Sequence, residues 1–559
     1  MDNTRLFLYA GLVFISMLIY QQWQADYGPK PEVAPTQYSQ KPSSTSEDGS
    51  DLSITDIPDV ADTQQQSPVD MIESSANSSV TQQSGKLVTV QTDVYDIVIN
   101  TVGGVLESVK LRNYPVSLEN KTELIELAFK KQDSVYLIQS GLRSKDSPAP
   151  THHSKYQIDQ ESYELADGED NLRIALNWRK DGIEVIKSYE FERGQYLINV
   201  NHQIKNNSTQ NWNGSQYRQI QRSRPLETSR LLNTYTGAVV YNEEIKYDKV
   251  NFDDIEEGPL RLSSAGGWIA MLQHYFLSAW IPTEQENNLA YSIANIKQYP
   301  AAYSIGLRSA NMNVDIGSQG EFNSRLFIGP KLVHELEAIS PGLDLTVDYG
   351  VLTFLSKPLY WLLEFFAGIT GNWGFAIILL TLSIKAVFYK LSETSYRSMA
   401  KMRKVGPRLK TLKERYGDDK QKMNKAMMEL YKTEKINPMG GCLPILVQIP
   451  VFIALYWALL ESVELRQAPF ILWIQDLSIQ DPYFVLPVIM GISMFIQQRL
   501  NPTPPDPIQA KVMMALPLVF CVFFAFFPAG LVLYWVVNNI LSIAQQWMIT
   551  KRIEAGAES

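Results

Sequence analysis

One cation lies inside a long apolar run. It is Lys385, within residues 372–390, whose sequence is NWGFAIILLTLSIKAVFYK. A helix over these residues rises about 1.5 Å per residue and approaches the thickness of a bilayer's hydrocarbon core. A charge at that depth costs about 3 to more than 10 kcal/mol unless it faces water or a partner. Thr381 lies four residues earlier, on the same helix face. We therefore expect Lys385 to mark a water-filled path, with a lysine that snorkels to the nearby headgroups as the alternative.

Uncharged polar residues accompany Lys385 in the apolar runs of the C-terminal half. Amides and hydroxyls in membrane helices often hydrogen-bond from helix to helix, which is one interpretation of each residue taken singly. Together with Lys385 they form the second interpretation, the lining of a wet cavity open to the cytoplasm. These residues are Thr381, Gln448, Ser493, Gln497, Gln498, Asn538, Asn539, Ser542 and Gln545.

The sequence predicts no catalytic residues, no metal site and no cofactor, so we do not expect an enzyme. HExxH, GxSxG and glycine-rich phosphate-loop motifs are missing from it, as is a pair of intramembrane aspartates. His152 and His153 are adjacent, so on a strand they would point to opposite faces. The other histidines lack Cys, Asp or Glu at ligand spacing. The core runs show neither duplicated halves nor a carboxylate relay, which disfavours a transporter.

The N-terminal part divides into an anchor, a tether and a β domain. Residues 1–24 contain an apolar run without small residues at a cleavage site, which predicts an uncleaved transmembrane anchor. Residues 25–84 are rich in Ser, Gln, Pro and Asp, and we expect a disordered tether. Residues 85–345 alternate apolar and polar side chains between turn residues, which predicts a β-sandwich. One helix at about residues 331–339 should close it.

Residues 346–559 are predicted to form a helical membrane region. Aromatic residues at 350–369 favour a helix lying in the membrane interface. Together with the anchor, five further spans give a multi-pass protein of six spans. A basic helical hairpin at 391–438 should stay in the cytoplasm, because short basic loops do so. Alternation then places the β domain outside and both termini in the cytoplasm. The five spans lie at about 372–390, 440–460, 483–497, 512–527 and 530–549.

The hairpin carries 13 Lys and Arg against six acidic residues, which is more than topology requires. Such a surface should bind polyanionic RNA, so we predict contact with the ribosome or a targeting factor. The alternative is a solvated face that only sets topology. The cations expected to make the contact are Lys404, Arg408, Lys410 and Lys413.

Long stretches of the C-terminal half resemble the YidC/Oxa/Alb family of membrane protein insertases. The resemblance covers about residues 350–550, and the anchor, tether and large β domain resemble the family's Gram-negative form. The segments that carry it are NWGFAI, SMAKMRKVGPRLK, GDDKQKMNKAMMELYK, INPMGGCLPILVQIPVFIALYWALLESVELRQAPFILWIQDLSIQDPYFVLPVIMG and FPAGLVLYWVVNNILSIAQQ.

The resemblance implies a five-helix core with a hydrophilic groove, open to the cytoplasm and lipid and closed towards the periplasm. Lys385 matches the family's basic groove residue, which is most often Arg; lysine keeps the charge but lacks the bidentate fork. Thr381, Gln448, Tyr534 and Trp535 match groove or client-contact positions. Relatives often end in a basic, ribosome-holding tail, whereas this chain ends KRIEAGAES. The hairpin would then have to hold the ribosome.

The function that these features predict is insertion, folding and assembly of integral membrane proteins in the bacterial inner membrane. The expected partners are nascent membrane proteins, the ribosome with a targeting factor, the Sec translocon and the lipid bilayer, with the chain acting as a monomer. The β domain is expected to be a periplasmic supersandwich. Two alternatives remain: a membrane-anchored periplasmic carbohydrate-binding protein and a small-solute channel.

Overall fold

The computed structural model describes residues 85–225, 234–283, 286–416, 419–434, 443–501 and 507–555. The predicted anchor at 1–24 and tether at 25–84 lie outside the described residues.

Two sheets form the β domain, and the first has eleven strands within the described residues. The pairings along it are antiparallel except for β1 with β6, and β18 (Met312–Val314) pairs with β10. Along the sheet the order is β13 (Arg261–Ala265), β16 (Asn287–Asn295), β17 (Ala302–Ser309), β10 (Trp212–Arg222), β5 (Val135–Ser144), β4 (Leu124–Lys130), β3 (Val105–Pro115), β2 (Tyr95–Asn100), β1 (Leu87–Gln91) and β6 (Ser162–Glu164).

The second sheet has eight described strands, all paired antiparallel. Their order is β12 (Lys246–Val250), β11 (Gly237–Asn242), β14 (Trp268–Leu272), β15 (Phe276–Pro282), β19 (Gln319–Pro330), β9 (Leu197–Asn206), β8 (Ile183–Glu192) and β7 (Asn171–Lys180).

The two sheets share one apolar core, which confirms the predicted sandwich. Alternate residues such as Ile97 and Ile99 of β2 and Ile198 and Val200 of β9 are buried in it. The polar face of these alternating strands is thereby directed away from the core, as period-two patterning requires, whereas β14 and β15 are buried on both faces. The predicted closing helix is present as α3 (Val333–Ile339). A short helix, α2 (Phe252–Glu257), follows β12.

A lysine is enclosed in the sandwich core. Lys187 of β8 is fully buried, and its ammonium donates hydrogen bonds to the carbonyl oxygens of Gly103 (2.9 Å), Ser140 (3.0 Å) and Gly104 (3.1 Å). Gly103 and Gly104 have φ values of 76° and 58°, a backbone conformation that glycine adopts without strain. The turn therefore offers two carbonyls to one buried cation.

The strand considered for the adjacent histidines is not present. His152 and His153 lie in a turn rather than on a strand, and their ring centroids are 4.1 Å apart. The alternation that separates neighbouring side chains applies only to extended backbone. The His152 ring is buried and shares a hydrogen bond of 2.6 Å with the Tyr217 hydroxyl.

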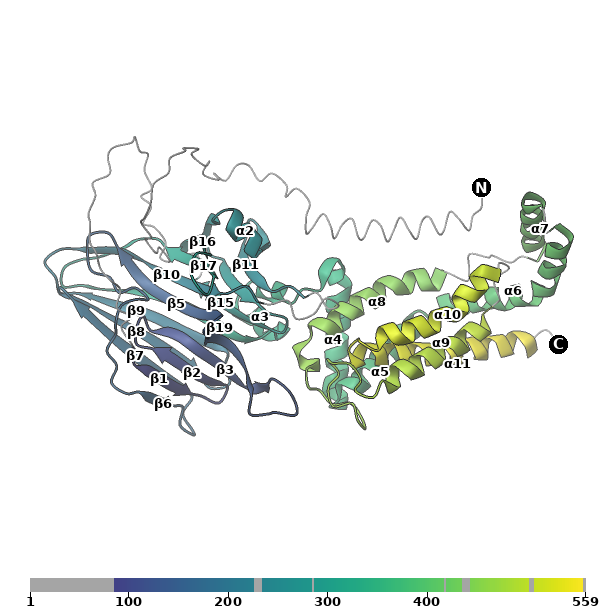
Figure 1. The fold of residues 1–559 in the computed structure, drawn as a ribbon, viewed down its shortest axis with the longest axis horizontal. Coiled ribbons are helices and arrows are strands. Elements are labelled where there is room, and N and C mark those ends of the chain that lie inside the picture. Colours follow the sequence, from purple (N-terminus) through teal and green to yellow (C-terminus); the bar gives the residue numbers. More distant parts are fainter. Residues whose placement is uncertain are drawn as a thin grey trace. The chain divides into compact units, whose positions relative to one another are not determined.

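The C-terminal region is helical (Figure 1). Its apolar core is formed by residues of α4, α5, α8, α9 and α11, such as Leu380, Ala454 and Val532, together with Phe524 of α10 and residues of the segment between α8 and α9. Short 3-10 turns at Leu343–Thr346, Gly350–Leu352 and Val463–Leu465 lie beside the helices. The helices are α4 (Thr353–Thr370), α5 (Trp373–Val387), α6 (Tyr389–Tyr416), α7 (Lys420–Thr433), α8 (Leu443–Glu461), α9 (Val485–Leu500), α10 (Pro507–Phe524) and α11 (Ala529–Ala555).

The turn between α4 and α5 is fixed by local chemistry. Gly371 ends α4 in the left-handed conformation, with φ of 64°. The Asn372 side chain then accepts hydrogen bonds from the backbone N–H groups of Gly374 and Phe375 and caps α5. On α4 the aromatic side chains of Phe354, Trp361 and Phe365 are exposed. That this face lies in the membrane interface stays a prediction.

The predicted continuous helix over 372–390 is interrupted. α5 ends at Val387, α6 starts at Tyr389, and the two helices meet at 68°. Phe388 closes α5 by donating its N–H to the carbonyl oxygens of Ile384 and Ala386. Beyond this point the sequence becomes polar and basic, and α6 does not continue along the axis of the apolar helix α5.

Length and hydropathy give limited support for spans. Among the described residues, the bent pair Trp373–Val387 with Tyr389–Leu409 is long and apolar enough to cross a bilayer, and no single helix meets that criterion. The count of six spans therefore stays a prediction.

Several contacts join the β domain to the helical region. The Arg466 guanidinium donates to the carbonyl oxygens of Pro115 and Val116, at 2.6 and 3.0 Å. Lys331, which follows β19, forms a buried ion pair of 3.6 Å with Glu461 at the end of α8. These contacts involve one end of α8 and the loop that follows it, and none of these residues lines the cavity described next.

Candidate functional site

A cavity of about 330 Å³ lies among α6, α8, α9, α10 and α11. We call it the interhelical cavity. Hydroxyl and amide groups share its wall with aromatic and methionine side chains. Its lining consists of Ser392, Ser395, Tyr396, Met399, Gln448, Ile449, Phe452, Met494, Gln497, Gln498, Asn501, Met513, Leu516, Pro517, Tyr534, Trp535, Asn538, Asn539 and Ser542.

Lys385 lies directly behind this wall. Its side chain is buried, with 8% of its surface exposed, and the ammonium donates a 2.7 Å hydrogen bond to the Ser542 hydroxyl. Ser542 in turn donates to the carbonyl oxygen of Asn538, at 2.7 Å. The protein encloses the ammonium. Snorkelling would instead require the side chain to extend along the outer surface.

One face of α11 supplies much of the wall. Trp535, Asn538 and Ser542 follow at intervals of three and four residues, so they project in the same direction. Tyr534 and Asn539 line the cavity beside them. The Asn539 amide donates to the Ser493 hydroxyl of α9, at 3.1 Å, which fixes the two helices against each other.

An aromatic cluster forms the apolar part of the wall. The rings of Phe452 and Trp535 lie 4.7 Å apart, and the Trp535 ring is 5.7 Å from that of Phe524. The indole N–H of Trp535 is buried and has no hydrogen-bond partner within the described residues. Polar and aromatic groups thus line the same cavity.

The predicted groove residues are divided by their position. Gln448, Tyr534, Trp535, Asn538 and Asn539 line the cavity, and Lys385 reaches it through Ser542. Thr381 does not line it. Its buried hydroxyl donates to the carbonyl oxygen of Ile377, at 2.6 Å, one turn earlier in α5.

Sequence reasoning missed the contribution of α6. Ser392, Ser395, Tyr396 and Met399 line the cavity, although they fall in the segment assigned to the basic hairpin. Their spacing of three, four and seven residues places Ser392, Ser395 and Met399 on one helix face, and this was the available signal. The strongly basic residues that follow obscured it.

The hairpin consists of α6 and α7. Asp419 caps α7 by accepting hydrogen bonds from the backbone N–H groups of Gln421 and Lys422. Lys404 and Arg408 are exposed, and Arg408 forms an ion pair with Glu434 across the hairpin. The side chains of Lys410 and Lys413 lie outside the described residues.

The geometry offers binding groups rather than reactive groups. In the part of the chain that the structure describes, no three His, Cys, Asp or Glu side chains are placed to hold a metal ion. The interhelical cavity contains no carboxylate, thiol or histidine among its lining residues. It can hydrogen-bond a polar chain segment and pack against an apolar one.

Two family models match the chain in succession. Residues 87–362 match the YidC periplasmic domain, and residues 365–556 match the 60Kd inner membrane protein. Together they include both the sandwich and the helices around the interhelical cavity.

Relatives match over nearly the full length. A membrane protein insertase YidC of Thioalkalivibrio sulfidiphilus is 52% identical, with 99% of each chain covered. One from Methylococcus capsulatus is 51% identical over the same shares. Among solved structures, a YidC insertase with its first transmembrane domain resolved is 17% identical, covers 83% of this chain and 92% of its own, and gives a TM-score of 0.38. On the strength of the family models and the full-length relatives, the chain belongs to the YidC family of membrane protein insertases.

Proposed function

We propose that this insertase works through the interhelical cavity. The observation that carries the proposal is the buried Lys385 ammonium bonded to Ser542, in a wall of hydroxyl and amide groups. A hydrophilic segment of a nascent membrane protein enters the cavity from the cytoplasm. The adjoining apolar segment stays beside the helices, in lipid.

The physical advantage lies in the polar groups of the client. Moving an unpaired amide or hydroxyl into hydrocarbon costs several kcal/mol, and every backbone group faces this penalty. Side chains such as Gln448, Asn538 and Asn539 offer replacement hydrogen bonds part of the way across. No covalent step is needed, because the client's own apolar burial in lipid drives the transfer.

The proposed topology has six spans. The anchor at 1–24 and five C-terminal spans cross the inner membrane, and the sandwich lies in the periplasm. Both termini and the hairpin lie in the cytoplasm. The clustering of basic residues in α6 and α7 supports this orientation.

We derive the proposed partners from the positive charge of the hairpin and from the synthesis of the clients on ribosomes. The exposed cations of the hairpin, including Lys404 and Arg408, contact the ribosome or a targeting factor. The chain inserts clients as a monomer, alone or beside the Sec translocon.

Crosslinking tests the cavity directly. A photoreactive amino acid at Asn538, which lines the cavity, should crosslink the hydrophilic segment of a ribosome-bound client. The matched control is Ile540, two residues along the same helix and 50% exposed on another face. We expect client adducts from position 538 that depend on the hydrophilic segment. Equal adducts from both positions would contradict the proposal.

A further inference from the structure

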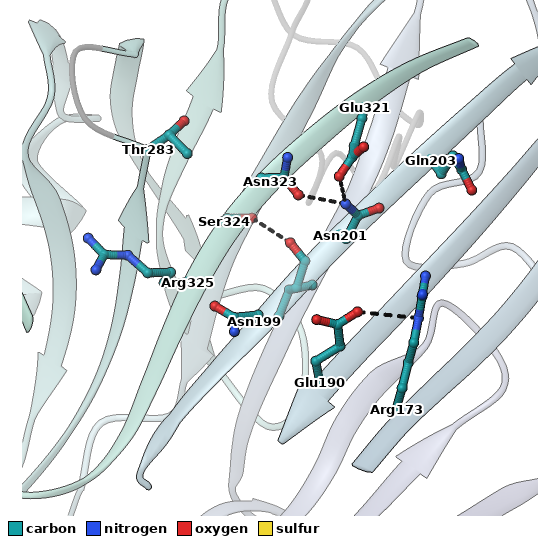
Figure 2. A pocket seen from close by; sticks show the side chains of 11 residues that line it. Arg173, Glu190, Asn199, Asn201, Gln203, Thr283, Glu321, Asn323, Ser324 and Arg325 are labelled. Atoms are coloured by element: carbon teal, nitrogen blue, oxygen red, sulfur yellow. Dashed lines mark hydrogen bonds and ion pairs between the residues drawn. The ribbon is translucent and has the colours of Figure 1, made fainter. Parts of the chain in front are cut away.

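A second cavity, of about 570 Å³, lies on the sandwich, far in the sequence from the helices that form the interhelical cavity. It covers the polar face of β7, β8, β9 and β19, four consecutive strands of the eight-stranded sheet. Its volume falls in the range typical of small-molecule sites. Figure 2 shows its side chains standing on these strands.

The strand register arranges these side chains as a grid. Arg173, Glu190, Asn199 and Arg325 occupy one row across the four strands, because each pairs directly with the next. Strands lie roughly 4.8 Å apart, and side chains two residues along a strand face the same side.

Two further rows follow on β9 and β19. Asn201 pairs with Asn323 in the second row, and Gln203 pairs with Glu321 in the third. Rows are separated by roughly 7 Å along the strands. The register therefore holds amide, carboxylate and guanidinium groups at fixed intervals on a rigid sheet.

Internal contacts hold part of the grid in place. The Arg325 guanidinium donates to the carbonyl oxygen of Ile339, at 3.1 Å. Arg173 forms an ion pair with Glu190, with 3.3 Å between Nε and Oε1. The Asn201 amide donates to Asn323, at 2.5 Å. Asn199 lies between Glu190 and Arg325 (Figure 2), and its side chain has no hydrogen bond within the described residues. Oriented groups thus surround an available amide.

The chemistry of the grid selects a class of ligand. Two arginines and two glutamates balance, so the cavity does not favour a strongly charged ligand. The one apolar residue among its lining residues is Val200, whose side chain is buried in the sandwich core, so an apolar ligand would bury little apolar surface. The backbone groups of β8 and β9 are used in ladders on both sides, so an extended peptide cannot add as a strand.

The ligand that remains is one recognised through many hydroxyl groups. A hydroxyl donates and accepts, and a side-chain amide offers one acceptor and two donors in a single plane. We propose that this cavity is a binding site for an uncharged oligosaccharide. The site is separate from the insertion path and gives the β domain a ligand of its own.

Saturation-transfer NMR on the full-length chain tests this. The chain is held in a zwitterionic detergent without a sugar headgroup, because alkyl glycosides would compete. The probes are maltotetraose, cellotetraose and chitotetraose, each at about 5 mM to detect weak binding. A short peptide of Gly, Ser and Asn is the polypeptide probe. The test variant is Asn199→Ala with Gln203→Ala, and the matched control is Asn177→Ala, on the same face of β7 but outside the cavity lining.

We expect transfer signals from at least one saccharide and none from the peptide. Removing two amides should weaken binding about tenfold or more, whereas the control should bind like the unmodified chain. Asn199 has no side-chain hydrogen bond to lose, and Gln203 loses one long hydrogen bond, of 3.4 Å to Gln319, so the unfolding midpoint of the variant should change little. The proposal is overturned if no saccharide gives signals, if the double variant binds equally well, or if the peptide binds in place of the saccharides.

Discussion

Replacing Lys385 by alanine should impair clients whose translocated segment is acidic. A carboxylate about 4 Å from the ammonium gains roughly 4 kcal/mol at the effective dielectric constant of a protein surface, and about 1 kcal/mol if the cavity is fully hydrated. Lys385 is 8% exposed, so the value should lie between these limits. Losing this attraction should weaken the binding of an acidic segment to the cavity roughly fivefold to several hundredfold. The wall should stay in place, since Ser542 still donates to the Asn538 carbonyl.

In vitro insertion of paired clients measures this difference. The two clients are identical except for Asp or Asn in the translocated segment, and protease protection reports insertion. Lys390→Ala is the matched control, because it removes an exposed lysine of α6 and changes the net charge equally. The Asp client should lose insertion with Lys385→Ala but not with Lys390→Ala, and the Asn client should change little.

Two further substitutions test how the sign of the charge at position 385 affects insertion. Lys385→Arg should be tolerated, because it keeps the charge, and Lys385→Glu should be worst for the acidic client. If the lysine only snorkelled, alanine would relieve a desolvation penalty and leave both clients unharmed. Equal insertion of the Asp and Asn clients by the unmodified chain and by Lys385→Ala would refute the reasoning.

Three other predictions concern the rest of the chain. Deleting residues 30–320 should leave most client insertion intact in a depletion strain, since the β-domain contacts do not reach the interhelical cavity; complete loss with a folded core would contradict this. Burial lowers the pKa of Lys187 to about 7, from its usual 10.5. Above pH 7 the unfolded chain therefore binds one more proton than the folded chain, and stability relative to Lys187→Met should rise by about 1.4 kcal/mol per pH unit up to 10.5 in denaturant unfolding. Reversing hairpin cations should weaken salt-sensitive ribosome co-sedimentation, and unchanged binding at low salt would leave topology as their role; the changes are Lys404→Glu, Arg408→Glu, Lys410→Glu and Lys413→Glu.

Much of the architecture could be predicted from local patterns. Alternation in strands such as β2 and β9 reports which face is buried, so the sandwich followed from period two. The cap at Asp419 is also a local feature, because a short side-chain acceptor lies just before the helix that it caps. Most of the cavity residues on α11 followed because polar groups are conspicuous in an apolar run.

The remainder depends on contacts between distant segments. Nothing local to Lys385 indicates that its partner is Ser542, which is 157 residues away in the sequence. Thr381 shares a helix face with Lys385 but satisfies its hydroxyl within α5, and sequence spacing does not distinguish these outcomes. The His152–His153 turn was missed because two adjacent residues carry no periodicity.

The break at Phe388 has a consequence for how often the cavity can be used. It places Lys385 in the last turn of α5, where the unpaired carbonyls of the helix end carry partial negative charge. No carboxylate forms an ion pair with Lys385 within the described residues; the ammonium donates to the Ser542 hydroxyl, and the helix terminus adds only its favourable field. An arriving acidic segment has no resident counter-ion to displace, and a departing one leaves the ammonium solvated by the same two groups. Binding and release of an acidic client segment should therefore have similar, low barriers. An insertase needs this because it must release every client.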